Sequence, residues 1–149
     1  MSQYSIVTVE QRHTAVVKST VALADLPNAE RSARAKIADV LPKLDIGPVG
    51  DSFTLCRMPK NGTMYLEPGM IVTRAFDADG DVVPSHLPGG RTARHVLVGP
   101  FDRLPQAWPA LFAWCASQGL KLEGAFWQVY GPTAADPASQ ETTLYALLA

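Results

Sequence analysis

The sequence has 149 residues, which is enough for one domain with a sizeable core. Its 47% hydrophobic and 18% charged residues are typical of a globular protein, and a net charge of −1 argues against a nucleic-acid-binding surface, which is usually basic. No apolar stretch reaches the length that crosses a membrane, and the first residues lack the pattern of a signal peptide, so we expect a cytoplasmic protein that binds neither nucleic acid nor membrane.

The two cysteines, Cys56 and Cys115, stand in apolar surroundings. Neither belongs to a CxxC pair or to a Cys/His spacing that would hold zinc. We therefore expect two free thiols, no metal site and no cofactor.

The first half of the chain begins with an extended segment and a helix. Residues 5–10 and 14–21 are rich in Ile, Val and Thr, which favours a strand that bends near residues 11–13. Asp25-Leu26-Pro27-Asn28 marks the start of a helix, and Pro42 weakens or ends it. The apolar residues that share one face of this helix are Ala33, Ile37, Val40, Leu41 and Leu44.

Two strands complete the first half. Residues 51–58 form the first of them, and the Asn-Gly pair of Lys60-Asn61-Gly62-Thr63 predicts a tight hairpin. The chain returns over residues 64–76, where Pro68-Gly69 marks a point of interruption. Residues 77–90 are polar and proline-rich, and we interpret them as a connection between the two halves.

The second half has the same order of elements. Residues 91–98 form a strand, Gly119 ends a helix, and residues 126–130 and 142–148 form two further strands. Residues 131–140 form the loop between these two strands. The residues that share one face of the helix are Phe101, Leu104, Trp108, Leu111 and Cys115.

The repeated order predicts one domain over residues 1–149, built from repeats at about residues 4–77 and 91–149. Such a duplication buries its apolar faces only when both copies pack together. We therefore expect an α+β fold, in which a duplicated βαββ unit forms one antiparallel sheet with two helices on one face. A groove is expected near the pseudo-twofold axis that relates the two halves.

Several motifs of the second half occur in the order of a known family. The chain carries a Pro-Gly turn, a strand that ends in Gly-Pro, a Trp within the helix, a Gly-Leu pair, and a strand with two spaced aromatic residues. This combination resembles the GyrI-like small-molecule-binding domain, an SHS2-like duplication that also forms the effector-binding part of AraC-type and MerR-type multidrug-responsive regulators. The motifs are Leu87-Pro88-Gly89-Gly90-Arg91, His95 to Phe101, Trp108-Pro109-Ala110-Leu111, Gly119-Leu120 and Trp127-Gln128-Val129-Tyr130.

Two features depart from the family pattern. The resemblance implies a glutamate that pairs with cationic aromatic drugs, but the chain carries Gln128 at that position. An amide donates and accepts hydrogen bonds but supplies no charge. In addition, the predicted domain begins within the first ten residues, so we expect a stand-alone form without a helix-turn-helix segment.

The candidate ligand-binding residues follow from this resemblance and from strand alternation. Period-two alternation puts Phe126, Gln128 and Tyr130 on one face of their strand, which the resemblance assigns to the pocket. Tyr65 and Glu67 form the corresponding pair in the first half. Glu67 is either solvated or lines the pocket, where it would replace the acid missing at Gln128. Further candidates, each either core or ligand contact, are Phe101, Trp108 and Tyr145.

Other polar residues are assigned structural roles. His95 lies within a strand and has no nucleophile beside it in the sequence, so we interpret it as a structural histidine rather than a base. Arg31, Arg34 and Lys36 form a basic cluster, which we interpret as a solvated helix face. No catalytic residue is assigned.

The resemblance leaves three kinds of function open. The leading one is binding of an aromatic or amphipathic small molecule, including cationic xenobiotics. The first alternative is a hydrolase that opens strained cyclopropane rings of genotoxic compounds, for which Glu67 would be the acid. The second is a protein-binding role, such as inhibition of a topoisomerase.

Overall fold

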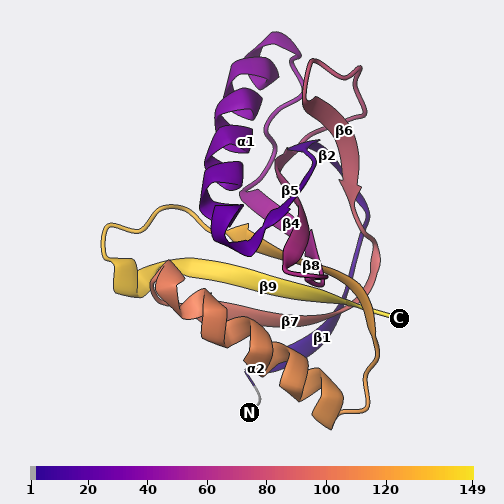
Figure 1. The fold of residues 1–149 in the computed structure, drawn as a ribbon, viewed down its shortest axis with the longest axis vertical. Coiled ribbons are helices and arrows are strands. Elements are labelled where there is room, and N and C mark those ends of the chain that lie inside the picture. Colours follow the sequence, from indigo (N-terminus) through magenta and orange to yellow (C-terminus); the bar gives the residue numbers. More distant parts are fainter. Residues whose placement is uncertain (1–2) are drawn as a thin grey trace.

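The computed structural model describes residues 3–149. Within this range, nine strands form one antiparallel sheet that carries two α-helices (Figure 1). The helices are α1 (Leu26–Val40) and α2 (Leu104–Ser117). The strands are β1 (Tyr4–Val9), β2 (Arg12–Val17), β3 (Ser19–Ala22), β4 (Ser52–Arg57), β5 (Thr63–Ile71), β6 (Val82–Leu87), β7 (Gly90–Val98), β8 (Leu122–Tyr130) and β9 (Glu141–Leu148).

The strand order confirms the predicted α+β duplication. It runs β1-β7-β9-β8-β4-β5-β2-β6, with β3 paired to β5. The series β7-β9-β8 therefore mirrors β2-β5-β4 across the central pair of β8 and β4. Each half contributes strand, helix, strand and strand in the same order, so the pseudo-twofold axis passes between β4 and β8.

The two halves exchange their outermost strands. β1 precedes β2 in the sequence but pairs with β7, and β6 precedes β7 but pairs with β2. Each of these connections contains only two residues, so opposite ends of the sheet must come close together. The crossing is tight, because a Cβ atom on Gly89 would lie 2.8 Å from the backbone nitrogen of Gln11. The sheet is therefore rolled rather than flat.

The prediction that residues 77–90 form only a connection is wrong. Val82–Leu87 is strand β6, which follows a turn at Asp79 to Val82 and pairs with β2. Pro84 lies opposite Ala15 in this ladder. A proline lacks the backbone N–H that a central strand needs, but β6 is the last strand of the sheet and tolerates the loss.

The remaining elements agree closely with those predicted from the sequence. α1 carries a proline in its first turn and buries Ala33, Ile37 and Val40, as its apolar spacing predicts. α2 buries Leu111 and Cys115. β5 continues as one strand through Pro68-Gly69, because Pro68 falls between the pairing with β3, which ends at Leu66, and the pairing with β2, which begins at Gly69. Neither helix is long and apolar enough to cross a membrane within the described part of the chain.

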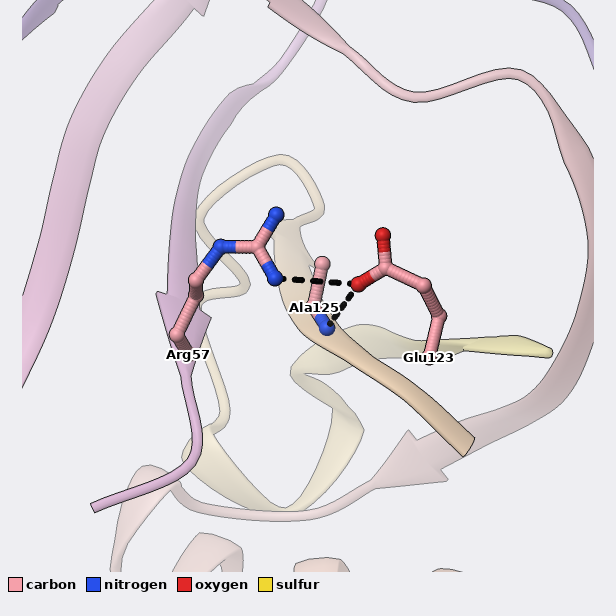
Figure 2. A network of polar contacts seen from close by, with 3 residues as sticks. All are labelled: Arg57, Glu123 and Ala125. Atoms are coloured by element: carbon pink, nitrogen blue, oxygen red, sulfur yellow. Dashed lines mark hydrogen bonds and ion pairs between the residues drawn. The ribbon is translucent and has the colours of Figure 1, made fainter. Parts of the chain in front are cut away.

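A polar contact joins the end of β4 to the start of β8 (Figure 2). Arg57 Nη1 donates to Glu123 Oε1 over 2.9 Å, and the same oxygen accepts from the backbone nitrogen of Ala125 over 3.1 Å. The contact spans the irregular register of β8 between Leu122 and Phe126. Because the two charged side chains are 54% and 39% exposed, the pair itself contributes only about 0.5 kcal/mol. The contact lies at the start of β8, the strand that also carries the candidate residues Phe126, Gln128 and Tyr130.

Candidate functional site

Strand β8 presents its alternate side chains to opposite faces of the sheet. Phe126 packs against Trp108 of α2, with ring centroids 4.8 Å apart, which places Phe126 on the helix-covered face. Gln128 and Tyr130 follow on the same face, as the alternation predicts. Trp127 belongs to the core of the other face, where it stacks on Tyr145.

A chain of hydrogen bonds crosses the helix-covered face from α2 to α1. Trp108 Nε1 donates to Gln128 Oε1 over 2.9 Å, and Gln128 Nε2 donates to the Tyr130 hydroxyl over 2.7 Å. The Tyr130 and Thr54 hydroxyls lie 3.0 Å apart, and Thr54 Oγ1 donates to Glu30 Oε1 over 2.8 Å. The chain therefore ends on a carboxylate.

The directions of the bonds at the two ends of this chain follow from the end groups. An indole N–H only donates and an ionised carboxylate only accepts. Trp108 therefore orients the Gln128 amide, whose nitrogen turns the Tyr130 oxygen into an acceptor. The Tyr130 hydroxyl then donates toward Thr54 over 3.0 Å or toward Glu30 Oε1 over 3.5 Å, and the Thr54 proton points to Glu30. A ligand that binds at Glu30 therefore meets polar groups that are already held in place, as in a preformed site.

Glu30 and Arg34 are site residues that the sequence analysis missed. They lie one turn apart on α1 and are both half-buried. Arg34 Nη2 donates to Thr54 Oγ1 over 3.0 Å and to the Phe53 carbonyl over 3.3 Å, and its guanidinium carbon lies 5.1 Å from the centre of the Tyr130 ring. The interpretation of Arg34 as part of a solvated basic face is therefore wrong. Arg31 and Lys36 are exposed, as that interpretation requires.

Burial and the nearby carboxylate raise the pKa values of two acidic groups on this face. Burial is the larger cause and Glu30 the second at both positions. The pKa of the Cys56 thiol rises to about 12, and the pKa of Tyr130 is also raised, although Thr54, Gln128 and Arg34 oppose the shift. Both groups are therefore neutral at pH 7, and Tyr130 keeps the proton that the hydrogen-bond chain requires.

Two adjoining cavities open beside this chain. The first, which we name the groove, has a volume of about 440 Å³ and is lined by Glu30, Arg34, Ser52, Phe101, Leu104, Gln128 and Tyr130. The second, which we name the proline cavity, has a volume of about 570 Å³ and contains Pro42, Pro48 and Pro132 in its wall. The two share Arg34, Ser52 and Tyr130. Each volume lies within the range of small-molecule sites.

Phe101 and Trp108 take different places at the groove. Phe101 lies in a short 3₁₀ turn before α2, is 50% exposed, and meets the Tyr130 ring edge-on at 5.8 Å. It therefore offers a free aromatic surface to the groove. Trp108 is not among the lining residues and instead orients the Gln128 amide.

The structure separates Tyr65, Glu67 and Tyr145 from this groove. In the sheet, Glu67 pairs with Leu55, which pairs with Trp127, which in turn pairs with Tyr145. Cross-strand partners share a face, so these side chains lie on the face opposite Gln128. The prediction that all the candidate residues line one groove is therefore wrong, because alternation along one strand does not fix the phase of its neighbours.

Glu67 is neither solvated nor in the groove. It is 8% exposed, and its carboxylate accepts from the Tyr65 hydroxyl over 2.7 Å and from Ser85 Oγ over 2.6 Å. Ser85 belongs to β6, the strand that the sequence analysis interpreted as a connection. Because its partners are on the far side of the sheet, Glu67 does not replace the acid that Gln128 lacks. Glu30 is the carboxylate that lines the groove.

A third cavity lies within the rolled sheet, on the face without helices. It has a volume of about 390 Å³, and Trp127 and Tyr145 form an aromatic part of its wall. Their rings are 5.4 Å apart and 18° from parallel.

His95 contacts the Gln3 carbonyl through Nδ1 over 3.2 Å, in line with a structural role. Within residues 3–149, no group of three or more metal-ligating side chains comes together.

Comparisons with known proteins agree with this architecture. The family model of the GyrI-like small molecule binding domain matches residues 2–146. The comparison with curated protein sequences finds no match.

Several solved structures share the fold. The EcmrR C-terminal domain superposes with a TM-score of 0.82 and 17% identity, over 99% of this chain and 97% of the other. SAV2435 bound to tetraphenylphosphonium gives a TM-score of 0.71 and 14% identity, over 98% and 93%. A hydrolase from Listeria innocua, encoded by lin2189, gives a TM-score of 0.63 and 11% identity, over 98% and 91%.

Proposed function

Because this chain belongs to the GyrI-like small molecule binding domain family, we propose that it binds small organic molecules with an aromatic part in the groove between α1 and α2. The observation that carries the proposal is a cavity that joins an exposed aromatic ring, Phe101, to an oriented polar chain. Apolar walls with a few convergent polar groups are the usual composition of a ligand site.

The groove divides the recognition between two kinds of contact. Phe101, Leu104 and the Tyr130 ring supply apolar surface for a planar ligand. Gln128 and Glu30 supply polar atoms that are held in place before binding, which lowers the cost of ordering the site. The ligand is therefore aromatic or amphipathic, with a polar group that reaches the hydrogen-bond chain.

The wider biological setting is part of the same proposal. SAV2435 holds tetraphenylphosphonium and EcmrR has a C-terminal domain of this fold, so we extend the ligand class to xenobiotics of several kinds, as in multidrug recognition by AraC-type effector-binding domains. The free thiols of Cys56 and Cys115 support a cytoplasmic location. In this proposal the chain contacts no DNA and no membrane.

Binding of a neutral aromatic dye tests the proposal. N-phenyl-1-naphthylamine should fluoresce more strongly with the protein, and Phe101→Ala should weaken its affinity at least fivefold because the exposed aromatic wall is removed. Leu23→Ala is the matched control, since Leu23 is 45% exposed and lies outside the groove. Dye affinity that is absent in the wild type, or equal in both variants, would remove the groove as the site.

Hydrolysis is a second candidate function. Glu30 places a carboxylate in the groove, where it is a better-placed general acid or base than Glu67 on the opposite face. The hydrolase from Listeria innocua shares the fold. Strained-ring substrates that contain a cyclopropane should then be consumed by the wild type and not by Glu30→Gln. Equal product formation by Glu30→Gln would exclude Glu30 as the catalytic group.

A further inference from the structure

We propose that Arg34 selects ligands that carry a carboxylate, and that the apolar part of such a ligand occupies the proline cavity. This inference rests on the proposed small-molecule binding and adds the charge of the ligand and the cavity that holds it. It assigns the site to aromatic or amphipathic carboxylic acids rather than to cations.

Arg34 retains most of its donors for a ligand. A guanidinium carries five N–H groups, on three nitrogens. Both hydrogen bonds of Arg34 within the described residues start from Nη2, and they go to Phe53 and Thr54. No carboxylate of residues 3–149 forms an ion pair with Arg34. Nε and Nη1 therefore have no hydrogen-bond partner among residues 3–149, and a fork of donors is what a carboxylate accepts in two parallel bonds.

The orientation of Arg34 is held independently of any ligand. Its Nη2 atom is fixed by the Phe53 carbonyl and the Thr54 hydroxyl, and its plane lies near the Tyr130 ring. The side chain is half-buried, so solvent screens its charge less than that of the exposed Arg31 on the same helix. A cation that is oriented, partly desolvated and not in a direct ion pair is favourable for an anionic group.

The position of Arg34 favours a ligand carboxylate that lies in the proline cavity. Among the described residues, Arg34 is the only basic one in the walls of either cavity, and it lines both. Glu30 lines the groove but not the proline cavity, and the Thr54 hydroxyl lies between the Glu30 and Arg34 side chains. A carboxylate that approaches Arg34 from the proline cavity therefore avoids the Glu30 carboxylate. The other charged residue of that wall, Asp51, is exposed to solvent.

The walls of the proline cavity suit the rest of such a ligand. Ile37, Leu41 and Met70 line it from α1, the segment that follows α1, and β5. Three prolines complete the apolar surface, and a volume of about 570 Å³ accommodates a molecule with two fused rings. The cavity thus joins a rigid apolar wall to one oriented cation, which is the pair of features that an aromatic acid requires.

A charge series on one ring system tests the inference. Calorimetric titration with 2-naphthoate, 2-naphthamide and 2-naphthylmethylammonium compares an anion, a neutral amide and a cation of nearly the same size. We expect 2-naphthoate to bind about tenfold more tightly than the amide, the gain typical of a charge-assisted bidentate contact, and the cation to bind most weakly. Equal affinities, or tightest binding of the cation, would overturn the inference.

Two variants and one control locate the effect. Arg34→Gln should reduce the naphthoate affinity to that of the amide, whereas Arg31→Gln, an exposed arginine on the same helix, should leave the series unchanged. Ala38→Phe adds a ring to an exposed position in the wall of the proline cavity and should weaken naphthoate binding without disturbing Arg34. Unchanged naphthoate affinity in Ala38→Phe would contradict the proposal that the ligand occupies the proline cavity.

The neutral dye separates this inference from the proposed function. If N-phenyl-1-naphthylamine binds the wild type but the naphthalene series has no preference for the anion, ligand binding stands and the selection by Arg34 is wrong. If neither the dye nor any naphthalene binds, the proposed function is wrong and this inference falls with it. Circular dichroism of Arg34→Gln confirms that the variant compared is folded.

Discussion

Gln128 illustrates how one atom changes what a site recognises. Its amide accepts from Trp108 and donates to Tyr130, so both ends are used within the protein. A glutamate there would accept from both neighbours, reverse the Tyr130 proton, and add a negative charge to the face that already holds Glu30. The amide thus keeps the groove at one carboxylate, and Glu30 on α1 is that carboxylate.

Gln128→Glu should therefore shift the ligand preference toward cations. We expect the affinity for tetraphenylphosphonium to rise by about tenfold, because a carboxylate beside the cavity attracts a cation at short range. Isothermal titration measures the change, and Gln118→Glu, at the exposed end of α2, is the control for added charge alone. An equal rise in both variants would mean that net charge, rather than the position, controls cation binding.

Cys56 should be almost inert toward alkylating reagents. Burial and the Glu30 carboxylate raise its pKa from 9.0 to about 12, so at pH 8 the thiolate is about a thousandfold less populated than in a free cysteine. Mass spectrometry after iodoacetamide treatment of the folded protein measures this. The same shift implies that the unfolding free energy falls as pH rises above about 9, because only the unfolded chain releases the thiol proton there. Fast labelling of Cys56 at pH 8 would contradict this environment.

At the scale of elements, Gly69 controls how β5 packs against β2. A Cβ atom at Gly69 would lie 2.5 Å from the Ala15 carbonyl oxygen and 2.6 Å from a Val16 methyl carbon. Gly69→Ala should therefore lower the unfolding free energy by about 2 kcal/mol, which chemical denaturation measures. Gly50→Ala is the control, since its Cβ would make only an ordinary contact with Ile71 at 3.5 Å. Equal stability of the two variants would contradict the close approach of the strands.

The sequence predicts elements whose signals are local. The Asn61-Gly62 hairpin, the proline-started α1 and the alternation of β8 all depend on neighbouring residues, and the structure confirms them. β6 was missed because Pro84 argues against a strand until the partner shows that β6 is an edge.

The composition of the site depends on contacts between distant residues, and this limited its prediction. Tyr65 and Glu67 were expected beside Gln128, but the phase between β5 and β8 is set through β4, and no pattern within either strand encodes it. Glu30 and Arg34 carry a detectable signal, since they stand one turn apart on a helix whose apolar positions are known. Only the bonds to Thr54 distinguish them from an ordinary solvated pair.

At the scale of the whole molecule, the exchanged outer strands join the two halves. β1 completes the sheet of the second half and β6 completes that of the first, so neither half keeps its strands when the other unfolds. The chain should therefore unfold in one cooperative transition. Trp108, Trp114 and Trp127 all lie in the second half, so their fluorescence is weighted toward that half, whereas far-ultraviolet circular dichroism reports on both halves equally. Separate midpoints for the two signals would contradict the interlocked fold.

In the proposed function, ligands bind on the helix-covered face, between α1 and the end of β8. Two-dimensional ¹H–¹⁵N nuclear magnetic resonance of the whole chain, titrated with 2-naphthoate, tests this most directly. We expect the shifted amides to cluster at residues 30–38 of α1 and residues 128–133. Shifts confined to Val9, Leu87 and Tyr145, which line the cavity on the opposite face, would contradict it.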